Sequence, residues 1–324
     1  MIKSAWKSVQ IKVFFLVVFL LPSLAWAADS GQIYFSEGFE DLNFTARGWY
    51  SVTQNQTVVY DEERKGNVLQ FYAPEAGMVS GISMRHTIPE TESVYVRFYV
   101  KYSENWEWTG QMYGPHEIYI ITNKQASTAN PAITNLTCYI EANNGKPHLV
   151  MQDALNIDSS RINEDLSDIT ENRAVAGGNG CGADGAEYCS AYYSTVVWRW
   201  LNGKGWKTSD TLIDNNKWYL IEASFKMNSI VNGKAVADGH VKYWLNNTLV
   251  INSENVILRT GQNPDMQFKY IIIAPYFHGG VPHPQGYWID DFAVSDGSIG
   301  GSGLAQDLTP PAEPTGLTLI LKEF

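Results

Sequence analysis

The chain has 324 residues, which suits one large domain or two modest ones. Hydrophobic residues make up 44% and charged residues 18%, a composition that excludes a disordered chain. With 23 basic and 34 acidic residues the net charge is −11, so the protein should repel nucleic acid, and we expect no nucleic-acid partner. Aromatic residues reach 13%, which favours β structure because flat side chains pack well on pleated surfaces.

Residues 1–27 predict a secretory signal peptide. Three lysines precede the apolar run Val13–Leu21, and Ala25-Trp26-Ala27 supplies a cleavage site of small residues. The run is too short to span a bilayer, which takes about 20 residues in a helix, and no later run qualifies, so we expect no transmembrane segment. We therefore expect a secreted or periplasmic protein with a mature charge of 20 minus 34, or −14.

Strand-like runs follow one another from residue 31 to about residue 296, separated by turn residues, and long amphipathic helical patterns are lacking. Many short strands of this kind predict an all-β sandwich or barrel. The clearest runs are Ser93–Tyr102, Glu117–Thr122, Asn135–Ala142, Thr195–Leu201, Trp218–Met227, His240–Leu245, Tyr270–Ala274 and Tyr287–Val294.

One strand carries an unusual second face. In Val94–Tyr102, valine and phenylalanine alternate with aromatic and cationic residues, so one face is core and the other presents Tyr95, Arg97, Tyr99 and Lys101. Rings of this kind stack on sugars, while charged groups bind hydroxyls and carboxylates. The pattern therefore favours a carbohydrate groove, and the alternative is an ordinary amphipathic sheet face.

Two further strands are expected to contribute to the same surface. Regular alternation in His116–Thr122 puts His116 on one face with Ile118, and Tyr119 on the other. Tyr139 and Glu141 share one face of their own strand. We expect these side chains to meet those of the first strand in one hollow.

The cysteines and the C-terminus suggest further features. Cys181 and Cys189 flank a glycine-rich loop, and in an oxidising compartment we expect them to form a disulfide, while Cys138 should point into the core. Residues 297–324 read as a Gly/Ser/Pro-rich linker. Its segment Asp307–Leu319 resembles the opening strand of a fibronectin type III module.

Several segments of the chain resemble the concanavalin A-like jelly-roll superfamily, in particular its secreted, polysaccharide-lyase-like bacterial members. The segments are EGFED at Glu37–Asp41, RGWY at Arg47–Tyr50, VYVRFYVKY at Val94–Tyr102, HEIYIIT at His116–Thr122 and GYWIDDFAVSD at Gly286–Asp296. The resemblance implies a jelly-roll β-sandwich of two antiparallel sheets over residues 28–296, with polysaccharide as the partner. It departs from the family's glucanases, whose E-x-D-x-x-E motif is absent, and from one group of alginate lyases, whose R-x-E-x-R, Q-x-H and Y-x-K-x-G-x-Y-x-Q elements are absent.

A lyase that eliminates across a uronic acid needs three groups. A cation neutralises the carboxylate, a base removes the neighbouring proton, and an acid protonates the leaving oxygen. Arg97 or Arg85 suits the first role, His116 or His86 the second, and Tyr99 or Tyr119 the third. We therefore predict a catalytic set of Arg97, Tyr99, His116 and Tyr119, and a substrate-binding set of Tyr95, Lys101, Arg85, His86 and Glu141.

Other functions remain open from the sequence. A non-catalytic carbohydrate-binding or adhesion module would show the same aromatic strands, and a structural cell-surface spacer would need only the sandwich. We expect no required cofactor, but acidic residues near the first and last strands offer oxygen ligands for a structural calcium ion. These residues are Glu37, Glu40, Asp290 and Asp291, and the alternative is a solvated acidic cluster.

Overall fold

A computed structural model describes residues 31–53, 56–79, 81–108, 116–124, 136–152, 170, 204–277 and 279–299. The predicted signal peptide, the predicted disulfide of Cys181 and Cys189, the predicted strand Thr195–Leu201 and the predicted linker beyond residue 299 all lie outside these residues. Within the described part, no helix is long and apolar enough to cross a membrane.

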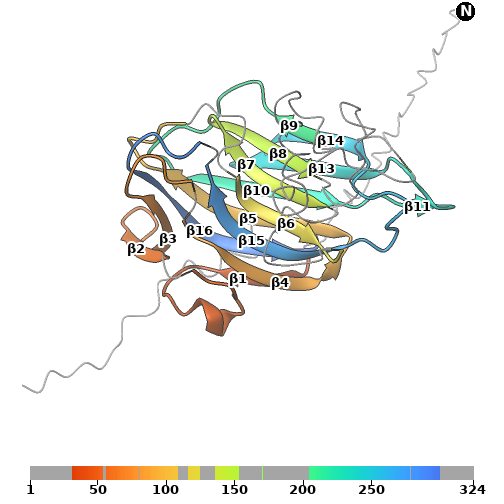
Figure 1. Ribbon diagram of the computed structural model, residues 1–324, viewed down its shortest axis with the longest axis horizontal. Helices are drawn as coiled ribbons and strands as arrows, with labels where there is room; N and C mark the ends of the chain where they lie inside the picture. The colour runs from red at the N-terminus through yellow and green to blue at the C-terminus, as the bar shows by residue number, and fades with distance from the viewer. Residues whose placement is uncertain are drawn as a thin grey trace, which may run out of the picture.

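The strands form two antiparallel sheets that lie one against the other (Figure 1). Sheet A has eight strands: β14 (Thr248–Val256), β13 (Gly239–Leu245), β10 (Tyr219–Lys226), β5 (Ser93–Tyr102), β16 (Gln285–Ser295), β3 (Gly66–Ala73) and β2 (Thr57–Asp61) in spatial order, with β1 (Ile33–Glu37) also paired to β16. Sheet B has six: β4 (Met84–Thr91), β15 (Phe268–Tyr276), β6 (His116–Thr122), β7 (Thr137–Asn143), β8 (Lys146–Gln152) and β9 (Lys204–Lys207). A short 3₁₀ helix η1 (Phe44–Arg47) and the small hairpin of β11 (Ile230–Val231) and β12 (Lys234–Ala235) complete the described elements.

The core lies between the two sheets and is built by alternation. In β5, Val94, Val96, Phe98 and Val100 are fully buried and pack against inward side chains of sheet B such as Ile118. Where a strand is regular, it therefore contributes every second residue to one apolar layer. The prediction of an all-β jelly-roll sandwich is confirmed, and Cys138 lies fully buried in the same core, as expected.

The central strands of sheet B are buried on their outer face as well. Every residue of β6 and β7 is buried, which departs from the simple alternation of a sheet with one wet face. A second apolar cluster of Tyr119, Ile121, Tyr139, Val150 and Ile272 lies on this outer face. The two sheets therefore differ, because the outer face of sheet B offers a largely dry aromatic floor.

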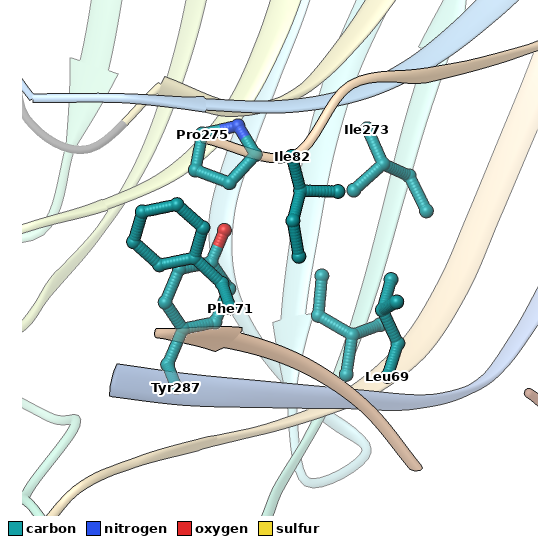
Figure 2. Close-up of a pocket in the computed structure, with 7 residues that line it drawn as sticks. Leu69, Phe71, Ile82, Ile273, Pro275 and Tyr287 are labelled. Carbon is teal, nitrogen blue, oxygen red and sulfur yellow. The ribbon is translucent and has the colours of Figure 1, made fainter. Parts of the chain in front are cut away.

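A narrow apolar pocket lies inside the core between β3, β15 and β16 (Figure 2). Its lining residues are Leu69, Phe71, Ile82, Ile273, Pro275, Tyr287 and Ile289. The space between them is too small for a water molecule, so this pocket is a packing feature of the core and not a binding site.

Candidate functional site

A carboxylate flanked by two histidines lies on the outer face of sheet B. Glu141 on β7 pairs in register with His116 on β6 and with His148 on β8. Its Oε1 contacts Nδ1 of His116, and its Oε2 lies 3.1 Å from Nδ1 of His148. All three residues are buried, so these contacts are made in a low-dielectric environment where they are strong.

The pairing of Glu141 with His148 follows from a tight turn. Asn144 and Gly145 both have positive φ, at 55° and 72°, which is the conformation of a two-residue type I′ hairpin. This turn fixes the register of β7 and β8. Asn143 and Lys146 form the strand pair next to the turn, and Glu141 and His148 form the second pair after that one. The Asn-Gly dipeptide is the sequence signal that predicts this contact.

A β-bulge places His116 on the same face. His116 pairs with Glu141 and Ile118 pairs with Ile140, so Glu117 is an extra residue in β6. Regular alternation predicts that His116 shares the core face with Ile118, and that prediction is wrong. Because the bulge shifts the register by one residue, His116 points outward with Glu141 while Ile118 points into the core.

The charge of Glu141 orients both imidazole rings. Burial raises the pKa of Glu141, but the two histidines lower it more strongly, to about 2, so the group is a carboxylate at neutral pH. A carboxylate only accepts hydrogen bonds, so both Nδ1 atoms carry the proton that is donated to it. In its neutral form, His116 therefore holds its lone pair on Nε2, where it can accept a proton.

Three tyrosines surround the His116 ring. The ring centroids of Tyr139, Tyr119 and Tyr276 lie 4.5, 6.0 and 6.1 Å from that of His116, and Tyr276 is stacked with it at 18°. Burial, and then the charge of Glu141, raise the pKa of Tyr119 well above its usual value, so its hydroxyl is protonated. Tyr276 is 38% exposed and offers an accessible ring face beside the histidine.

Arg85 supplies a cation to the same face. In β4 the preceding residue Met84 points into the core, and Arg85 pairs with Ile272, which in turn pairs with Tyr119. Two strand spacings put its backbone about 10 Å from that of Tyr119, within the combined reach of the two side chains. Burial lowers the pKa of Arg85, but a guanidinium remains charged throughout the physiological range.

The expectation of one common groove is wrong. The side chains of Tyr95, Arg97, Tyr99 and Lys101 alternate with core residues on β5 and so lie on the outer face of sheet A. His116 and Tyr119 lie on the outer face of sheet B. The core separates these two faces, so Arg97 and Tyr99 cannot act on a substrate that contacts His116.

The cations of sheet A already have partners on their own face. Arg97 donates from Nη1 to the carbonyl of Ile299 at 2.8 Å, and Lys101 Nζ lies 2.5 Å from Oδ2 of Asp61. The Tyr99 ring lies under the guanidinium of Arg64, 3.9 Å from its centroid. The predicted binding residues of this face are therefore bound to other groups of the protein.

His86 is also directed away from the site. It pairs with Ile271, whose side chain is in the core, and its ring stacks on Phe35 with 3.8 Å between centroids. Burial is the main cause that lowers its pKa. His86 therefore packs under β1 and η1, and the structure does not bring it to the substrate-binding set.

The four carboxylates suggested for calcium divide into separate clusters. Glu37 accepts hydrogen bonds from Arg47 and Trp49, and Glu40 binds the backbone of Asn67. Asp290 and Asp291 are both held by Arg64. Among the described residues, no group of three or more His, Cys, Asp or Glu side chains is arranged to hold a metal ion. Calcium binding stays a prediction that this arrangement does not favour.

Two residues of the site, His148 and Tyr276, are not among the residues predicted from the sequence. His148 belongs to no motif, although the Asn-Gly turn predicts its pairing with Glu141. Tyr139 and Tyr276 border His116, and alternation predicts the face of Tyr139 alone. Glu141, expected to bind substrate, is instead buried behind the two imidazoles that it orients.

Comparison with known proteins supports the fold. No protein-family model matches the chain, and no curated protein matches it. The alginate lyase vAL-1 from Chlorella virus is similar in structure, with 15% identity, a TM-score of 0.55, and coverage of 82% of this chain and 100% of that chain. The endo-beta-1,4-glucuronan lyase from the fungus Trichoderma reesei is similar with 14% identity, a TM-score of 0.50, and coverage of 82% and 95%. The chain thus shares its jelly-roll fold with polysaccharide lyases.

Proposed function

We propose that the protein is a polysaccharide lyase that cleaves a uronic-acid glycan by β-elimination on the outer face of sheet B. The observation that carries the proposal is the buried Glu141 carboxylate, which orients the His116 ring through Nδ1 beside the protonated hydroxyl of Tyr119. The similar structures named as an alginate lyase and a glucuronan lyase support the same reaction class.

Each step of the elimination has a group on this face. Arg85 neutralises the substrate carboxylate, so that removal of the adjacent proton no longer builds an unscreened dianion. His116 Nε2 accepts that proton, and Glu141 stabilises the imidazolium that results. Tyr119 donates its hydroxyl proton to the leaving glycosidic oxygen as the carbon–oxygen bond breaks and the carbon–carbon double bond forms. Tyr119 suits this role because its raised pKa keeps it protonated.

The chain's negative charge makes the local cation important. With 34 acidic against 23 basic residues, the protein repels a polyanion at long range. Arg85 on a largely apolar floor concentrates the attraction at one point, where low dielectric strengthens it. We therefore expect a substrate that is recognised by its carboxylate and by stacking on Tyr276.

The test is an assay of the full chain on alginate, on glucuronan and on a neutral glucan, with ultraviolet detection of the unsaturated product. We expect product from at least one uronan and none from the neutral glucan. Tyr119→Phe should lower the rate on that uronan by about 10² to 10⁴-fold, as expected for loss of a general acid. Tyr99→Phe on sheet A is the matched control and should leave the rate unchanged. Absence of product from every uronan would refute the proposal.

A second candidate function is binding without cleavage, and the exposed ring of Tyr276 favours it. A ring face beside polar groups is how proteins commonly hold sugars. If the panel gives no product, calorimetry with the same three glycans separates the two functions. If the wild type binds a glycan and Tyr276→Ala abolishes that binding, the protein is a carbohydrate-binding module. If the wild type binds none of the three glycans, the structural spacer is the function that fits.

A further inference from the structure

Glu117, the neighbour of His116, has its carboxyl group inside the sandwich. The residue is 1% exposed, and its Oε1 accepts a hydrogen bond from the hydroxyl of Tyr102, a fully buried core residue of β5. Among the residues that the structure describes, its Oε2 has no hydrogen-bond partner, and neither do the buried hydroxyls of Tyr243 and Tyr287. A carboxyl group in such surroundings costs free energy, so its presence calls for a structural reason.

The reason lies in the register of β6. Glu117 is the extra residue of the bulge, so Glu117 and Ile118 both point inward and His116 points outward. A strand without the bulge would be shifted by one residue, with His116 in the core and Glu117 on the outer face. The inward position that regular alternation gives to His116 is therefore occupied by Glu117.

The surroundings of Glu117 favour its neutral form. Within the described part of the chain, the titratable groups that interact with it are Tyr102 on β5, Tyr243 on β13, Tyr287 on β16 and Glu141 on β7, and none of these is a cation. Burial and the charge of Glu141 raise the pKa of Glu117 to about 8, against the lowering effect of the Tyr102 hydrogen bond. At neutral pH the group is therefore mostly a carboxylic acid.

We propose that Glu117 is the positioning residue of the site, which holds the bulge through Tyr102 and so turns His116 outward onto Glu141. The catalytic consequence rests on the proposed function, but the effect on the His116 ring does not. Ionisation of Glu117 at alkaline pH would draw its carboxylate out of the core and release the bulge. The site would then lose the orientation of His116 above a pH of about 8.

Nitrogen-15 NMR of the histidine rings in the full chain tests this directly. In the wild type at neutral pH, His116 should show the tautomer protonated on Nδ1. Glu117→Gln keeps a neutral hydrogen-bonding group and should retain this signature to higher pH than the wild type. Glu117→Ala should lose it. Tyr102→Phe removes only the hydroxyl and should weaken it, and this variant serves if Glu117→Ala does not fold.

Thr122→Val is the matched control. Thr122 lies on the same strand, and its buried hydroxyl also lacks a hydrogen-bond partner in the described part of the chain, but it is remote from the bulge. This variant should leave the His116 signature unchanged. A wild-type signature in both Glu117→Ala and Tyr102→Phe would overturn the proposal, as would loss of the signature in Thr122→Val to the same degree.

Activity adds a second readout on the uronan that the wild type cleaves. Displacement of a base from its working position costs about 100-fold in kcat, so Glu117→Ala should show that loss with KM within about twofold. Glu117→Gln should restore most of the rate. Should the wild type cleave no uronan, the proposed function fails, and the NMR signature still decides whether Glu117 positions His116.

Discussion

The two outer faces of the sandwich carry similar residues but differ in how their charges are used. On sheet A, Arg97 and Lys101 are bound to a carbonyl and a carboxylate of the same face. On sheet B, the carboxylate of Glu141 is shared by two histidines, each of which contacts it through Nδ1. Residue type alone therefore does not identify a reactive face. What distinguishes the two faces is which partners their charged side chains are bound to.

The histidines give the sharpest test of this difference. His116→Gln on sheet B removes the proposed base and should lower the rate of uronan cleavage by about 10² to 10⁴-fold. His240→Gln on the outer face of sheet A, where the ring contacts Ser224, should leave the rate within about twofold. Steady-state assays of both variants check this. Equal losses in the two variants would contradict the assignment of the site to sheet B.

The arginines form a second matched pair. Arg85→Ala should lower the rate by about 10² to 10³-fold, since it removes the charge that stabilises the developing enolate. Arg97→Ala should leave it nearly unchanged, because Arg97 lies on the outer face of sheet A, where it holds the backbone of Ile299 and interacts with Glu222. The same assay at two ionic strengths measures the effect. If Arg97→Ala proved the more damaging change, the substrate would have to lie on sheet A.

Glu141 should also contribute to stability, with a dependence on acid. Its pKa of about 2 lies below the ordinary value of 4.5, so its stabilising contribution is present above pH 4.5 and is lost as the pH falls towards 2. Glu141→Ala leaves two buried histidines without their acceptor and should cost about 3 kcal/mol. Urea denaturation at pH 7 and at pH 3 measures this. We expect the difference between variant and wild type to shrink at pH 3, and a constant difference would contradict this view.

Glu117 should have the opposite pH dependence. Its pKa of about 8 lies above 4.5, so its contribution is fully present below pH 4.5 and is lost as the pH rises through 8. Relative to Glu117→Gln, the wild type should lose up to about 1.4 kcal/mol of stability per pH unit across this interval. Denaturant titrations at pH 5, 6.5 and 8 provide the measurement. Parallel profiles for the two proteins would show that Glu117 does not titrate in the folded state.

Much of the sandwich was predictable because alternation is a local property. The strand Ser93–Tyr102 was predicted with the bounds that the structure has, and the strand at His116–Thr122 within one residue. Its apolar residues went to the core as expected. A two-residue period follows from backbone geometry, so it needs no knowledge of the neighbouring strands.

The site was predicted only in part, because two of its features are not local. Alternation does not tell which of two outer faces a strand will serve, so Arg97 and Tyr99 were grouped with His116 although they belong to a different sheet. A bulge is equally invisible to a period of two, so His116 was placed on the face of Ile118.

The amino-acid order alone determined an all-β chain, the core-facing positions of its regular strands, and the tight Asn-Gly turn that pairs Glu141 with His148. Only the tertiary structure decided that β5 and β6 belong to opposite layers and that Glu117, not His116, enters the interior. The physical reason is that periodicity and turn geometry act over a few residues. Sheet membership and register, by contrast, are set by contacts between segments far apart in the chain.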